Sequence, residues 1–191
     1  MLPIMLNVEN KKCIVIGGGS VALRKAKKLI SFGGDVTVIS KTFCKGFENI
    51  KTKIKSYEKD DLNSAFLVIA ATNNHDINLQ ISKDAKEKNI LVSLADDRDV
   101  SDFIFPSSQS KGDITVSVST NGKYPLLSKK ICNEIDIDFY STLLPLLEKY
   151  RQELIKKSKD TLILHQLISE EMILLAKNNI TKFEQKIKEM L

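Results

Sequence analysis

The chain of 191 residues contains no tryptophan, four prolines and only three cysteines. Cys13, Cys44 and Cys132 lie far apart in the sequence, and no two of them have the Cys-x-x-Cys spacing. This scarcity and this spacing argue against a disulfide framework and against a structural zinc site, and we expect no metal ligands. The cysteines are expected to be reduced packing residues.

Long apolar runs are also missing. No stretch approaches the roughly 20 apolar residues that cross a bilayer, so a membrane partner is not expected. The start of the chain carries no basic leader, and polar residues follow at Asn7 and Glu9, which is unlike a secretory signal. We therefore expect a cytoplasmic protein.

No excess of one charge dominates the chain. The 29 lysines and arginines are set against 24 aspartates and glutamates, which gives a net charge of +5. Basic residues are interleaved with acidic ones, and the aromatic residues do not cluster beside them, so a nucleic-acid partner is not expected. The excess of positive charge equally suits a polyanionic small molecule.

The first part of the chain alternates short apolar strands with helical stretches. Residues 13–16 form a β-branched run that ends at three glycines, and apolar spacing then predicts a helix through Ile30. Gly33 and Gly34 end that helix, and residues 36–39 are predicted to form a second buried strand. Together these elements predict a right-handed βαβ unit.

The alternation continues downstream. Further strands are predicted at residues 67–71 and 90–94, with a helix from about residue 76 to residue 88 between them. Strands that alternate with helices predict an α/β fold, with a doubly wound parallel sheet of the Rossmann type.

The pattern changes near Pro106. Residues 114–119 alternate apolar and polar side chains, which is typical of a half-exposed strand and not of a buried parallel one. From about Ser141 onward, apolar residues recur at helical spacing, as expected for packing surfaces. The sequence therefore predicts a domain boundary near Gly112 and a helical C-terminal region.

Gly17, Gly19 and Ala22 have the Gly-x-Gly-x-x-Ala spacing of a dinucleotide-binding turn. The first glycine permits the tight turn, the second lets the backbone approach a pyrophosphate, and the small Ala22 allows close helix–strand packing. The helix that begins near Ser20 offers free N–H groups and a positive dipole end to phosphate oxygens. Because the motif lies between a predicted strand and a predicted helix, dinucleotide binding is favoured over a purely structural turn.

The second predicted strand ends at Ser40-Lys41-Thr42, where many NAD-binding folds place an acidic residue on the ribose diol. The hydroxyl groups of Ser40 and Thr42 can still bond a ribose, while Lys41 would tolerate or attract a 2′-phosphate. These residues leave the choice between NAD and NADP open.

Polar residues also follow the third and fourth predicted strands, where open α/β sheets bind ligands. Thr72 is a candidate cofactor contact in the first of these loops, and Asp96 and Asp97 lie in the second. An aspartate there could act as a general base, but adjacent acids equally often cap a loop, and the residues alone leave both readings open. His75 and His165 have no partner at metal-ligand spacing, so neither is assigned a role.

Five ordered motifs resemble the precorrin-2 dehydrogenases of siroheme biosynthesis. They lie at residues 2–4, 13–26, 70–74, 102–107 and 118–125, and the likeness covers roughly residues 2 to 130. The resemblance implies an NAD-dependent enzyme that oxidises precorrin-2 to sirohydrochlorin. It also implies a homodimer, and a division into an NAD-binding Rossmann domain, a dimerisation segment and a helical C-terminal domain, at residues 1–112, 113–145 and 146–191.

The same resemblance assigns roles by position. It places NAD contacts on Ser20, Val21, Lys41 and Thr42, and it makes Asp96 the favoured general base. Substrate contacts fall on the segment after the 114–119 strand, namely Thr120, Asn121, Gly122 and Lys123. The family has serine where this chain has Thr120, and glycine where it has Asn121. The chain also departs from the family at Ser93, commonly asparagine, and at Tyr124, commonly serine.

Two alternative functions stay open at this stage. Some members of the resembled family also insert iron into sirohydrochlorin, so a bifunctional dehydrogenase and ferrochelatase is one alternative. A regulatory module that binds NAD without hydride transfer is the other, because a fold alone does not determine a function. The ordered motifs around Asp96 and Thr120 favour the enzyme over the sensor.

Overall fold

The computed structural model describes residues 1–156 and 162–190. The chain divides into two compact units, Met1–Phe105 and Pro106–Leu191. The predicted boundary at Gly112 falls a few residues further on, in the turn of a hairpin within the second unit, where Gly112 has a φ of +54°. The three-part functional division stays a prediction.

The first unit is built on a parallel sheet of five strands in the order β3-β2-β1-β4-β5. The strands are β1 (Lys12–Ile16), β2 (Asp35–Ser40), β3 (Lys51–Ile54), β4 (Leu67–Ala70) and β5 (Leu91–Leu94). Its helices are α1 (Ser20–Ser31), α2 (His75–Glu87) and the short 3-10 helix η1 (Lys59–Leu62). This architecture confirms the predicted doubly wound α/β fold.

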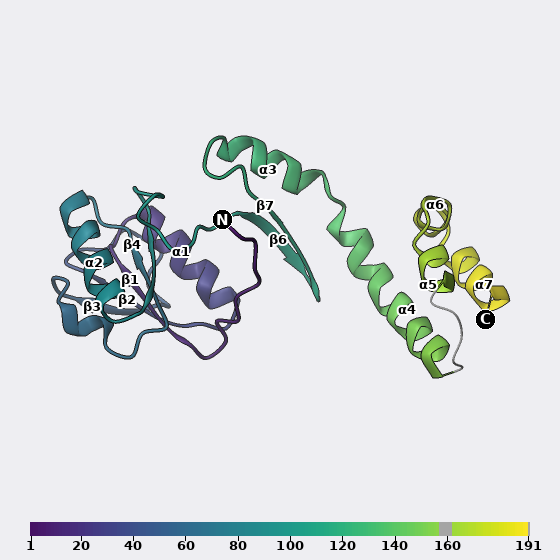
Figure 1. The fold of residues 1–191 in the computed structure, drawn as a ribbon, viewed down its shortest axis with the longest axis horizontal. Coiled ribbons are helices and arrows are strands. Elements are labelled where there is room, and N and C mark those ends of the chain that lie inside the picture. Colours follow the sequence, from purple (N-terminus) through teal and green to yellow (C-terminus); the bar gives the residue numbers. More distant parts are fainter. Residues whose placement is uncertain (157–161, 191) are drawn as a thin grey trace. The chain divides into compact units, whose positions relative to one another are not determined.

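Helices cover both faces of this sheet, which explains why its central strands are apolar throughout (Figure 1). Ala22, Ala26 and Leu29 of α1 pack in one core cluster with alternate residues of β1, β2 and β4. Ile81 and Ala85 of α2 pack in the other cluster, against the opposite face. The two clusters hold the carboxyl ends of β1, β4 and β5 in register at one edge, where open sheets of this kind bind ligands.

The edge strand β3 was not predicted from the sequence. It consists of alternating lysines with Thr52 and Ile54, and all four residues are exposed. Without a buried face such a strand has no apolar periodicity, and only its pairing with β2 reveals it.

The second unit begins with a hairpin. Strand β6 (Ser107–Lys111) pairs antiparallel with β7 (Ile114–Val118), so the strand predicted near residues 114–119 is confirmed, whereas β6 was missed because it is polar throughout. Helix α3 (Pro125–Glu134), also not predicted, is joined to the hairpin by the Gln109 side chain, whose Nε2 donates to the Cys132 carbonyl at 2.7 Å.

Helices account for most of the described residues in the rest of the second unit, as predicted. They are α4 (Ile137–Lys156), α5 (Leu162–Leu167), α6 (Glu170–Asn178) and α7 (Ile180–Met190). Their shared core contains Leu143, Tyr150, Phe183 and Ile187. Among the described helices, none is long and apolar enough to cross a membrane.

Candidate functional site

The glycine turn after β1 is shaped by close approaches of the backbone. Gly17 has a φ of +132°, and a Cβ at this position would lie 2.2 Å from the Ala71 carbonyl oxygen. A Cβ on Gly18 would lie 1.8 Å from the Thr42 carbonyl oxygen, whereas one on Gly19 would meet nothing within 4 Å. The turn is therefore closed on the sheet side and open at Gly19, which leaves room for a bound group against the backbone.

Helix α1 starts at this opening. Gly19 is its N-cap and offers no side chain, and the first turn contains no acidic residue. Among the described residues, no side chain therefore caps the N–H groups of the first turn, and the positive end of the helix dipole faces the same place. Ala22 is fully buried and allows the close approach of helix to sheet that the sequence predicts.

A pocket of about 680 Å³ adjoins the turn, and the structure brings six of the nine predicted cofactor residues to its wall: Gly17, Gly19, Ser40, Lys41, Thr42 and Thr72. The remaining three, Ser20, Val21 and Ala22, follow on α1 and do not line it. The wall also contains Gly18 of the glycine turn, and it contains Lys55, Tyr57 and Gln80, which sequence reasoning missed. The open glycine cradle and the size of the pocket fit a dinucleotide.

The loop after β4 is fixed by a buried asparagine. Asn78 is fully buried, and its Oδ1 accepts hydrogen bonds from the Thr72 N–H at 3.1 Å and from the Thr72 hydroxyl at 2.7 Å. Its Nδ2 donates to the Thr72 carbonyl at 3.2 Å. The Asn74 side chain caps α2 by accepting from the Ile77 N–H at 3.1 Å. Thr72 and the start of α2 are thereby held in one position at the carboxyl edge of the sheet.

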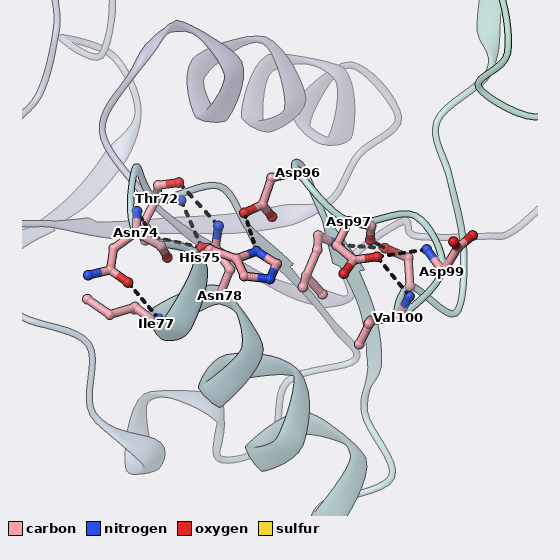
Figure 2. Close-up of polar contacts among 11 residues, drawn as sticks. Thr72, Asn74, His75, Ile77, Asn78, Asp96, Asp97, Asp99 and Val100 are labelled. Atoms are coloured by element: carbon pink, nitrogen blue, oxygen red, sulfur yellow. Dashed lines mark hydrogen bonds and ion pairs between the residues drawn. The ribbon is translucent and has the colours of Figure 1, made fainter.

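The two adjacent aspartates after β5 have different partners (Figure 2). Asp97 Oδ1 accepts from the N–H groups of Asp99 at 2.9 Å and Val100 at 3.2 Å. Its carbonyl accepts from the Ser101 hydroxyl at 2.7 Å, and that hydroxyl oxygen accepts from the Leu94 N–H at 2.8 Å. Asp97 is therefore the residue that caps the loop.

Asp96 instead contacts a histidine from another loop. Its Oδ2 lies 2.9 Å from His75 Nδ1, and the two side chains are partly exposed (Figure 2). Burial raises the pKa of Asp96, but hydrogen bonds with His75 and Asn78 outweigh it, and the net effect lowers that pKa. The hydrogen bond to Asp96 raises the pKa of His75. Sequence reasoning gave His75 no role, because its partner lies 21 residues away.

The predicted substrate residues form the turn between β7 and α3 in the second unit. Asn121 and Gly122 have φ values of 51° and 73°, in the left-handed region, where asparagine is the usual substitute for glycine. The Thr120 hydroxyl accepts from the Tyr124 N–H at 3.1 Å, and its carbonyl accepts from the Lys123 N–H at 3.0 Å. Thr120 therefore braces a turn that exposes Asn121, Gly122 and Lys123.

Comparison with known proteins places this site in a family. The family described as NAD(P)-binding matches residues 4–107. A precorrin-2 dehydrogenase of Bacillus subtilis is 35% identical over 142 residues, which cover 71% of this chain and 87% of that protein. The chain belongs to the precorrin-2 dehydrogenase family. The solved precorrin-2 dehydrogenase SirC matches with a TM-score of 0.75 and 25% identity, over 99% of this chain and all of SirC.

Longer proteins share the same region. The siroheme synthase of Vesicomyosocius okutanii is 38% identical over 136 residues, which are 68% of this chain but 29% of the synthase. The chain thus spans about a third or less of the length of the siroheme synthases that it matches. The match over most of the Bacillus protein favours the precorrin-2 dehydrogenase function over the bifunctional alternative.

Proposed function

We propose that this chain oxidises precorrin-2 to sirohydrochlorin, with NAD as the hydride acceptor. The observation that carries the proposal is the arrangement within the first unit. An open glycine cradle follows β1, and a carboxylate in contact with His75, that of Asp96, follows β5 of the same parallel sheet. The family relationship supplies the substrate, which no feature of the pocket names on its own.

Residues of the glycine turn and of α1 would hold the dinucleotide. Its phosphates would lie against Gly19 and the N–H groups of Ser20, Val21 and Ala22, and Ser40, Lys41 and Thr42 would be available to the ribose. Bound NAD would supply a nicotinamide ring that accepts a hydride. Thr72, fixed by Asn78, forms the neighbouring wall.

The chain's own chemical task is to remove a proton and to hold the substrate. Asp96 is ionised at neutral pH, because its pKa lies below its usual range, so it is available as an acceptor or as a partner of His75. Precorrin-2 carries many carboxylates, and the exposed loop with Thr120, Asn121, Gly122 and Lys123 offers a cation, a hydroxyl and backbone donors to them.

Purified chain supplied with precorrin-2 and NAD tests the proposal. We expect NADH and sirohydrochlorin to form together, and we expect no siroheme when ferrous ion is added. NAD binding without NADH formation would support the sensor alternative and contradict the proposal. Consumption of sirohydrochlorin on addition of ferrous ion would instead support the bifunctional enzyme.

We infer that the enzyme is a homodimer in the cytoplasm. Helix α3 exposes Leu126, Leu127 and Ile131, and apolar side chains grouped in this way are typical of a surface that another protein covers. Light scattering should give twice the chain mass of 21.5 kDa, and a mass of one chain would contradict the dimer. Cell fractionation tests the location.

A further inference from the structure

His75 and Asp96 come from different loops and meet at one edge of the sheet. His75 is the first residue of α2, directly after the Asn74 cap, and Asp96 follows β5 (Figure 2). Each loop is anchored separately, one by the Asn74 cap and the other by the hydrogen bonds that Asp97 accepts. Nδ1 of His75 lies 2.9 Å from Oδ2 of Asp96, so this contact links two loops that other hydrogen bonds already hold in place.

This contact determines which nitrogen of the imidazole is free. When Nδ1 carries the proton and donates it to Asp96, the lone pair of the neutral ring lies on Nε2. No second hydrogen-bond partner of the His75 ring occurs among the described residues, and its side chain is 53% exposed. The ring therefore presents a basic nitrogen to whatever binds at this edge.

We propose that Nε2 of His75 accepts the proton that leaves the substrate, and that Asp96 acts as the positioning residue that orients the ring. The proposal rests on the proposed function. Oxidation removes two hydrogens from precorrin-2, one as a hydride to NAD and one as a proton to His75. The electron pair of the bond that releases the proton forms the new double bond, and the ring becomes imidazolium beside Asp96.

The charges around the pair favour this division of roles. Asp96, Asp97 and Asp76 all raise the pKa of His75, while desolvation lowers it, and the positive end of the α2 dipole also opposes the imidazolium. The net shift is upward, so His75 titrates above its ordinary value. The pKa of Asp96 lies below its ordinary value, which makes it a weak base at neutral pH.

The dependence of kcat/KM on pH separates the two bases. For the wild type we expect activity to fall on the acid side with a midpoint above about 6.5, the ordinary pKa of histidine. His75→Gln should lose about 100-fold in rate and lose this acid limb. Asp96→Asn should lower the plateau and move the limb to lower pH, because His75 loses its anionic partner. His165→Gln, on α5, is the matched control and should keep the wild-type profile.

A second readout does not depend on activity. The pKa of His75, followed by NMR in the chain without ligands, should lie above 6.5 in the wild type and fall in Asp96→Asn. An unchanged His75 titration in Asp96→Asn, or a His75→Gln enzyme with the wild-type rate and profile, overturns the dyad alone. Failure of the wild type to form NADH from precorrin-2 overturns the proposed function, and the dyad with it.

Discussion

The glycine turn at residues 17–19 and the acidic loop at residues 96–102 follow strands of the same sheet, yet different forces shape them. In the turn, backbone atoms approach so closely that Gly17 and Gly18 have no space for a Cβ. In the loop, side chains set the shape, and the neighbouring Asp96 and Asp97 have different partners. A glycine in the sequence can indicate a position without space for a side chain. Hydrogen-bond partners, in contrast, can be identified only when the whole fold is known.

Gly18→Ala gives the largest expected effect, because its Cβ would lie 1.8 Å from the carbonyl oxygen of Thr42, a backbone atom that cannot turn away, and 2.8 Å from Ser40 Oγ. We expect a loss of about 3 kcal/mol or more in unfolding free energy, measured by denaturant titration. Gly19→Ala is the control, with a change of about 1 kcal/mol or less. Its Cβ would enter the open cradle, so NAD affinity should still fall by about tenfold. Equal stability losses in both variants would contradict the steric account of the turn.

Replacing each of the two aspartates by alanine in turn tests whether Asp96 and Asp97 have different roles in the acidic loop. Asp96→Ala should reduce kcat by about 100-fold or more with little change in stability. Asp97→Ala should lower the unfolding free energy by about 1 kcal/mol, because two N–H groups lose their acceptor, while keeping most of the activity. Parallel rate assays and thermal melts of both variants provide the check. The assignment fails if Asp97→Ala is the less active of the two.

The titration of Lys25 on α1 predicts how the stability of the first unit depends on pH. Burial and then Arg24 lower the pKa of Lys25 to about 8, although its ammonium lies 4.1 Å from the centre of the Phe105 ring. At Lys25 the unfolded chain therefore binds more protons than the folded chain from pH 8 up to about 10.5, so the contribution of this lysine to stability should rise with pH across that window. The raised pKa of Cys13, about 11, acts in the opposite direction above pH 9, so the rise is measured as the difference between the wild type and Lys25→Met. Lys25→Met should remove this rise in unfolding experiments at pH 8 and pH 10. Persistence of the full rise would show that Lys25 is not its source.

The smallest effect concerns the ribose region. Lys41 is exposed, and among the described residues no acidic one lines the pocket beside it to repel a 2′-phosphate. Lys41→Asp should therefore raise the preference for NAD over NADP by about fivefold, measured as a ratio of kcat/KM values. An unchanged ratio would place the 2′ position away from Lys41.

The sequence predicted those strands and helices that apolar periodicity or bordering glycines mark. Strands β1, β2, β4 and β5 have buried faces and were found, while the polar strands β3 and β6 have none and were missed. Helix α3 was also missed, because it buries only Ser128 and Cys132 and most of its apolar side chains are exposed.

The site was predictable to a smaller extent. The glycine spacing pointed to the cradle, but it did not reveal that Gly18 has the tightest backbone contact. The residue types alone could not distinguish Asp96 from Asp97, since both are adjacent acids in a loop, and only the family resemblance favoured Asp96. His75 was missed because only the pairing of β4 with β5 in the folded sheet brings its loop to Asp96.

If the dinucleotide cradle serves the oxidation of precorrin-2, a single-turnover experiment with the wild-type chain, precorrin-2 and NAD should show it. One NADH should form for each sirohydrochlorin, and both products should appear at the same rate. Bound NAD that stays oxidised while precorrin-2 persists would contradict this role of the cradle.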